Sequence, residues 1–139
     1  MKEILLTIFG TIGGVIAMLF GGWDAALTTL FIFMCIDYFT GLAVALIFHK
    51  SPKSKNGAYE SKAGWKGLCR KGTSLLVIVI AHRLDILTGT TLIRDGTIIA
   101  YIINESFSII ENAGLMGIPM PAVITNAIDI LKNKKDGDE

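Results

Sequence analysis

The chain has 139 residues, of which 52% are hydrophobic and 18% are charged, and its mean hydropathy is +0.58. Because a typical soluble domain carries about 25% charged residues, this composition predicts a protein that is partly immersed in lipid. The net charge of +1 gives no indication of a nucleic acid as partner. Cys35 and Cys69 lie in different settings and predict neither a disulfide framework nor a metal site.

The first apolar block, residues 4–22, contains no charge and has the length needed to cross a hydrocarbon core about 30 Å thick. It is longer than a usual signal core and lacks a cleavage-site pattern, so we expect a retained helix. Small residues four apart let another helix approach closely in lipid, although glycine is also common in transmembrane helices. The candidates for helix packing are Gly10, Gly14, Gly13, Ala17 and Gly21.

The second block, residues 25–48, is also predicted to span the membrane and carries one charge, Asp37, at its middle. Gly41 and Ala45 follow Asp37 at intervals of four, so the carboxyl group shares a helix face with small residues. We therefore expect Asp37 to face protein or water rather than lipid.

Residues 49–72 are polar and basic and predict an extramembrane loop. Seven of the thirteen Lys and Arg residues of the chain lie between positions 50 and 71. The positive-inside rule places such a loop in the cytoplasm. The basic residues near its end are Lys62, Lys66, Arg70 and Lys71.

His82, Arg83 and Asp85 interrupt the third apolar block, residues 73–93. Two interpretations stay open: a full span whose charges face other helices, or a shorter membrane helix with Arg83 and Asp85 near an interface. We predict the full span.

The fourth block, residues 97–118, has a polar stripe on one helix face, within an arc of roughly 120° at 100° per residue. The prolines at 119 and 121 end this helix. The stripe consists of Tyr101, Asn104, Glu105, Ser108, Glu111 and Asn112.

Residues 122–131 gather apolar side chains on one side, and three lysines follow at 132, 134 and 135. This pattern predicts a short amphipathic helix on an anionic cytoplasmic leaflet. With a basic loop and a basic tail both inside, the sequence predicts an all-α membrane protein with four spans and both termini in the cytoplasm.

Carboxylates at bilayer depth are costly and normally have a use. They can line an aqueous lesion, relay ions in a transporter, or fasten helices, in which case they are protonated or paired with Arg83. An enzyme is not indicated, because no nucleophile motif, phosphate-binding loop or Cys/His cluster is present, and we expect no cofactor. The candidates for pore lining or oligomerisation are Asp37, Gly41, Asn104, Glu105, Ser108, Glu111 and Asn112.

Four segments in order resemble the bacteriophage holin family, including the clostridial toxin-secretion holins. They are Asp-Tyr-Phe-Thr-Gly at 37–41, Ser-Lys-Ala-Gly-Trp-Lys-Gly-Leu-Cys-Arg-Lys at 61–71, Asn-Glu-Ser-Phe-Ser-Ile-Ile-Glu-Asn at 104–112 and Gly-Ile-Pro-Met-Pro at 117–121. Each segment alone is a weak motif. The motif positions also include Gly67, whereas His82 and Arg83 stand where a more apolar sequence is expected.

The resemblance implies a multi-pass protein of the bacterial (host) cytoplasmic membrane whose partners are the lipid bilayer and copies of itself. Such a protein oligomerises into lesions that release an endolysin to the cell wall or a toxin to the medium, without stable binding of this cargo. A small transporter or ion-channel subunit is the alternative, as is a non-conducting membrane scaffold.

Overall fold

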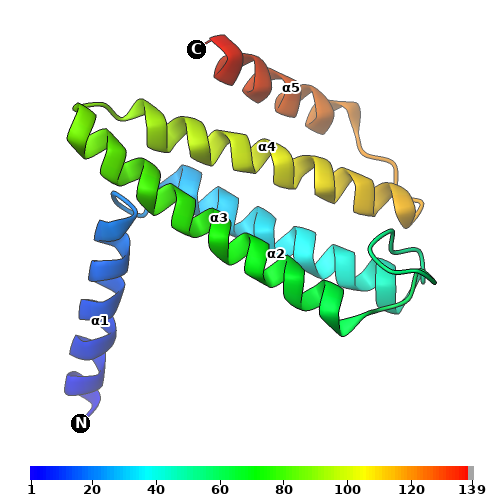
Figure 1. The fold of residues 1–139 in the computed structure, drawn as a ribbon, viewed down its shortest axis with the longest axis horizontal. Helices are drawn as coiled ribbons and strands as arrows, with labels where there is room; N and C mark the ends of the chain where they lie inside the picture. The colour runs from blue at the N-terminus through cyan, green and yellow to red at the C-terminus, as the bar shows by residue number, and fades with distance from the viewer. Residues whose placement is uncertain (138–139) are drawn as a thin grey trace.

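The computed structural model describes residues 1–137, which form five α-helices and no strand (Figure 1). The all-α fold predicted from the sequence is therefore confirmed for these residues. The helices are α1 (Lys2–Leu19), α2 (Ala25–Leu46), α3 (Ser61–Thr88), α4 (Leu92–Leu115) and α5 (Ala122–Gly137).

Two helices in the described part of the chain, α1 and α2, are long and apolar enough to cross a membrane. These helices correspond to the first two predicted spans. α3 and α4 have 28 and 24 residues, but their sequences contain more charged side chains. The structure thus supports a membrane protein with two clearly apolar helices.

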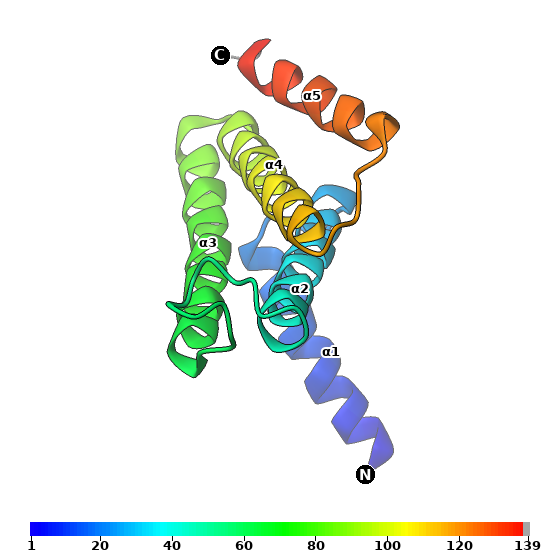
Figure 2. The ribbon, with the colours of Figure 1, turned by 90° about the vertical axis from the view of Figure 1, so that its right-hand side faces the viewer.

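α1 is the most exposed helix, and none of its residues is buried. Figures 1 and 2 show it directed away from the other helices. A Cβ atom added at Gly10, Gly13 or Gly14 would meet no atom within 4 Å, so this small-residue face has no partner within the described chain. Gly21 differs, because its φ is +77° and a Cβ atom there would lie 2.5 Å from Nδ1 of His82.

α2, α3 and α4 pack side by side as a three-helix bundle (Figure 2). The main apolar core combines side chains from the first half of α2, the second half of α3 and the first half of α4. This core therefore lies toward the end of the bundle that holds the α3–α4 turn. It consists of Leu27, Leu30, Met34, Ile78, Ile98 and Ile102.

α3 begins at Ser61, whereas the sequence predicted a loop up to residue 72. The prediction was wrong because this basic segment is amphipathic: Lys62 and Lys66 are exposed, while Gly64 and Gly67 lie near Tyr38 of α2. A helix can therefore solvate its charges on one side and pack on the other. α3 ends at Thr88, and Gly89 adopts the left-handed conformation that often follows a helix.

α4 begins at Leu92, five residues before the predicted start at 97. Asp85 supplies the reason, because its carboxylate accepts hydrogen bonds from the backbone N–H groups of Ile93 (3.0 Å) and Arg94 (2.8 Å). These N–H groups have no partner inside the helix, so a carboxylate from α3 stabilises the first turn of α4.

α5 returns antiparallel beside α4 instead of lying apart from the bundle (Figures 1 and 2). Leu131 packs against the apolar core, and Lys135 lies near Leu92 and Asp95 at the start of α4. The helix also runs to Gly137, beyond the predicted end at 131. Of the apolar side that the sequence assigned to lipid, Leu131 meets the core, whereas Val123, Ile124 and Ile130 stay exposed.

Candidate functional site: a buried polar cluster between three helices

Lys71 of α3 joins the other two helices of the bundle through two buried carboxylates. Its Nζ atom lies 2.7 Å from Oδ2 of Asp37 on α2 and 2.7 Å from Oε2 of Glu105 on α4. Asp37 and Glu105 are only 8% and 7% exposed. Buried charges are tolerated when they are paired and hydrogen-bonded, and Lys71 meets that condition for both acids at once.

Asn112 of α4 completes this group of side chains, which we call the Lys71 cluster (Asp37, Lys71, Glu105 and Asn112). Its Nδ2 atom lies 3.0 Å from Oδ1 and 3.1 Å from the backbone oxygen of Asp37, and 2.9 Å from Oγ1 of Thr40. Gly41 lies beside this group, and a Cβ atom there would make an ordinary contact, 3.7 Å from Nδ2 of Asn112. Each oxygen of the Asp37 carboxylate therefore has a donor.

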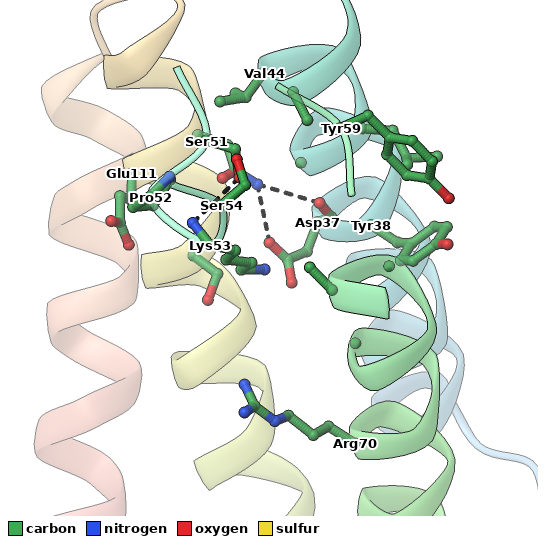
Figure 3. A pocket seen from close by; sticks show the side chains of 18 of the residues that line it. Asp37, Tyr38, Val44, Ser51, Pro52, Lys53, Ser54, Tyr59, Arg70 and Glu111 are labelled. Atoms are coloured by element: carbon green, nitrogen blue, oxygen red, sulfur yellow. Dashed lines mark hydrogen bonds between the residues drawn. The ribbon is translucent and has the colours of Figure 1, made fainter. Parts of the chain in front are cut away.

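A pocket of about 280 Å³ adjoins the Lys71 cluster between α2, α3, α4 and residues 47–60 (Figure 3). Polar side chains contribute much of its wall. Asn104 and Glu111 are exposed and Ser108 is half-buried, and all three line it. The further lining residues include Tyr38, Ser51, Ser54, Tyr59 and Arg70.

The polar stripe of α4 therefore faces this pocket and the Lys71 cluster. All members of the stripe except Tyr101 either line the pocket or bond to α2 and α3. Within residues 1–137, every buried side-chain nitrogen or oxygen has a hydrogen-bond partner. The buried Glu105 and the half-buried Asn112 of the stripe therefore find their partners inside a single chain.

Arg94 organises the opposite end of the bundle. Its guanidinium donates hydrogen bonds to the carbonyl oxygens of Phe20 and Gly22 (2.9 Å for Gly22) and forms ion pairs with Asp24 (2.8 Å) and Asp95 (3.2 Å). The hydrogen bond from Arg94 holds the pKa of Asp24 below its ordinary value of 3.8. Asp24 also accepts from the N–H of Leu27 at 2.9 Å and so caps α2.

The structure brings together only some of the residues singled out from sequence. Asp37, Gly41, Glu105 and Asn112 meet at the Lys71 cluster, and Lys71 itself comes from the segment predicted as a loop. The cluster leaves out Ala17, which is half-buried on α1, and the exposed Lys62 and Lys66. It also leaves out Gly10, Gly13 and Gly14, where an added Cβ atom would meet nothing within 4 Å.

Arg83 was considered as the partner of the buried acids, and this was wrong, because Arg83 is exposed and Lys71 takes that position. Arg94 was not predicted as a functional residue from the sequence. A signal was present, since Arg94 and Asp24 are charges placed beside the connections between apolar blocks, where opposite charges can meet.

These features define the class of protein: a helical membrane protein with charged residues paired inside its bundle. The chain matches the bacteriophage holin family over residues 14–133 and therefore belongs to that family. The resemblance noted in the sequence is confirmed by this match.

Relatives of similar length support the assignment. The chain is 37% identical to a 14.9 kDa protein of Clostridium perfringens over 90% of both chains, and 35% identical to a protein of Listeria monocytogenes over 99% of this chain and 94% of the relative. It is also 32% identical to a probable holin of Bacillus phage phi105, over 73% of this chain and 70% of the phage protein. No solved structure matches the chain.

Proposed function

We propose that the protein is a holin that oligomerises in the bacterial cytoplasmic membrane and forms lesions, which release an endolysin or a toxin and set the time of host lysis. Membership of the holin family and the similarity to the probable holin of phage phi105 support this function. No enzymatic family is indicated by the comparisons.

The observation that carries the proposal is the exposure of α1. This helix of 18 residues has no charge after Glu3, buries no side chain, and carries three glycines that face no other part of the described chain. An apolar helix of about 27 Å has a stable environment in lipid, and small residues allow close packing against a helix of another copy. Both properties are needed by a membrane protein that assembles with itself.

We further propose four spans with both termini in the cytoplasm. α3 and α4 are about 42 Å and 36 Å long at 1.5 Å per residue, which exceeds a hydrocarbon core of about 30 Å. The excess length of α3 accommodates its basic first turns outside the core. Residues 47–60 then lie in the cytoplasm together with the basic first turns of α3. The end of the bundle that holds Arg94 lies on the outer side of the membrane.

The topology requires that α5 leave α4 and lie on the cytoplasmic leaflet, because its lysines are costly to carry across the membrane. The connection is not helical, so α5 is not a continuation of α4: Gly117 has a φ of +78°, and prolines follow at 119 and 121. On the leaflet, the apolar side of α5 and its lysines would meet acyl chains and anionic headgroups.

Inducible expression together with an endolysin tests the function. We expect an abrupt fall in culture density after a lag, and release of folded protein from loaded vesicles. Continued growth without leakage, despite confirmed insertion, would contradict the proposal.

The polar stripe gives a sharper test. Replacing Glu105 and Glu111 together by Leu removes two costly carboxylates, so insertion should be maintained or improved, while lysis should be abolished if the lesion needs these groups. Immunoblots of membrane fractions measure insertion, and culture density measures lysis. Unchanged lysis timing would exclude this role of the stripe.

The polar pocket also favours a second candidate, a small transporter or ion-channel subunit. This function predicts selective flux of small ions from vesicles and retention of folded protein. A non-conducting scaffold, in which the Lys71 cluster only fastens helices, predicts no flux. Sizing the solutes that leave loaded vesicles separates the three functions.

A further inference from the structure

The bundle of α2, α3 and α4 is held together differently at its two ends. The end with the α3–α4 turn contains the large apolar core, the Arg94 interactions and the cap that Asp85 provides for α4. The other end contains the pocket, the Lys71 cluster and smaller buried apolar side chains, those of Val44, Ala45 and Ala113. Large apolar side chains therefore close one end, whereas at the other end the ion pairs of Lys71 join α3 to both α2 and α4.

Lys71 is the link between α3 and both neighbours at the polar end. In the described part of the chain, it is the only cation that forms an ion pair with Asp37 or with Glu105. The two carboxylate oxygens approach the same ammonium group, each at 2.7 Å. Without that ammonium, two buried negative charges would face each other, which strongly disfavours the closed arrangement.

We propose that the Lys71 cluster is the closing device of the holin, and that separation of Lys71 from Asp37 and Glu105 is the step that opens the polar stripe of α4 to water and to neighbouring copies. This inference rests on the proposed holin function. α3 would turn away from α2 and α4 at the pocket end, while the apolar core and the α3–α4 turn keep the other end together. The opened surface would include Ser108 and Asn112, which lie at the pocket.

The decisive variant is Lys71→Met, which keeps the length of the side chain and removes its charge. Coexpressed with an endolysin, it should lyse cells in half the wild-type time or less, because the two carboxylates now repel. Arg83→Met is the matched control: it removes one positive charge from an exposed position of the same helix and should leave lysis time unchanged. Wild-type timing in Lys71→Met, or equal acceleration in both variants, would overturn the inference.

Glu105→Gln should act in the opposite direction. It leaves one ammonium facing one carboxylate, and the new amide oxygen can still accept from Lys71, so the closed form should be favoured and lysis delayed at least twofold. This variant also tests the inference if Lys71→Met does not accumulate in the membrane. Earlier or unchanged lysis in Glu105→Gln would then overturn the inference.

The reaction rate of an introduced thiol measures opening of the Lys71 cluster independently of lysis. In a background with both native cysteines replaced by Ser, Ser108→Cys should react slowly with a membrane-impermeant maleimide in inverted vesicles, and at least fivefold faster when Lys71→Met is added. Equal reaction rates would contradict the closing role even where lysis is observed. Faster labelling without lysis by the wild-type protein would retain the closing role and reject the holin function.

Discussion

The residues that matter most in this chain are polar groups satisfied by partners far away in sequence. Asp37, Lys71 and Glu105 are separated by 34 positions at each step, yet they meet within hydrogen-bond distance. The importance of both acids was predictable, since a charge inside an apolar block is costly. The partner was not predictable, because Lys71 lies in a segment whose charges resemble those of a solvated loop, and only the packing of α3 shows which of its basic residues turns inward.

Asn112 provides a prediction about the stability of the cluster. Asn112→Leu removes the donors near Oδ1 and the backbone oxygen of Asp37, and an unsatisfied buried acceptor costs about 1–3 kcal/mol. We expect a lower midpoint of thermal unfolding in detergent, measured by circular dichroism. Asn104→Leu, at an exposed position of the same helix, is the control and should change the midpoint little.

Asp24 provides a prediction about pH. Because the pKa of Asp24 is lowered in the folded protein, its ionised form stabilises the fold above its ordinary pKa, and this contribution is lost as the pH falls through the lowered value. The carboxylate is 48% exposed, so the effect is small, about 1 kcal/mol or less. Asp24→Asn should lower the thermal midpoint at neutral pH, and the difference from wild type should close at acid pH. A constant difference would contradict the ion pair.

The helices were predictable to different degrees. α1 and α2 follow directly from long apolar blocks that hold at most one charge, and their ends agree with the predicted blocks within three residues. The start of α3 was not found, because hydropathy detects the lipid-facing part of a helix and does not detect a polar extension of the same helix. The start of α4 depends on Asp85, a side chain from another helix, and could not be read from the local sequence.

The small-residue face of α1 provides a prediction about helix packing between copies of the protein. Gly10→Leu with Gly14→Leu should reduce the oligomer recovered after chemical cross-linking in membranes at least fivefold, because the bulky side chains prevent close helix approach. Val15→Leu, which enlarges another face of α1, is the control and should leave cross-linking intact. Unchanged oligomers in the double variant would assign the contact to another helix.

The molecule as a whole combines a closed bundle with two helices that have fewer interactions. The number of helices, the all-α class and the family could be predicted from the sequence, because they depend on long apolar blocks and on motif order. The position of α5 was not predicted, since the apolar side of an amphipathic helix suits a protein surface as well as a membrane surface. Composition alone does not distinguish these two partners.

The four-span topology predicts on which side of the membrane α5 and the connections between the helices lie. In a background without native cysteines, Lys134→Cys should react with an impermeant maleimide in inverted vesicles and be protected in intact spheroplasts, as should Lys55→Cys in the loop between α2 and α3. Trp23→Cys, at the opposite end of the bundle, should show the reverse pattern. If Lys134→Cys behaved like Trp23→Cys, α5 would accompany α4 across the membrane.

The Arg94 interactions have a consequence for sequence variation among relatives. Two of the groups that Arg94 binds are main-chain carbonyls, those of Phe20 and Gly22, and every amino acid offers the same carbonyl. The side chain of Phe20 is constrained separately, because it packs against the apolar core. Sequencing more members of the family should therefore reveal a guanidinium at position 94 together with an apolar side chain at position 20.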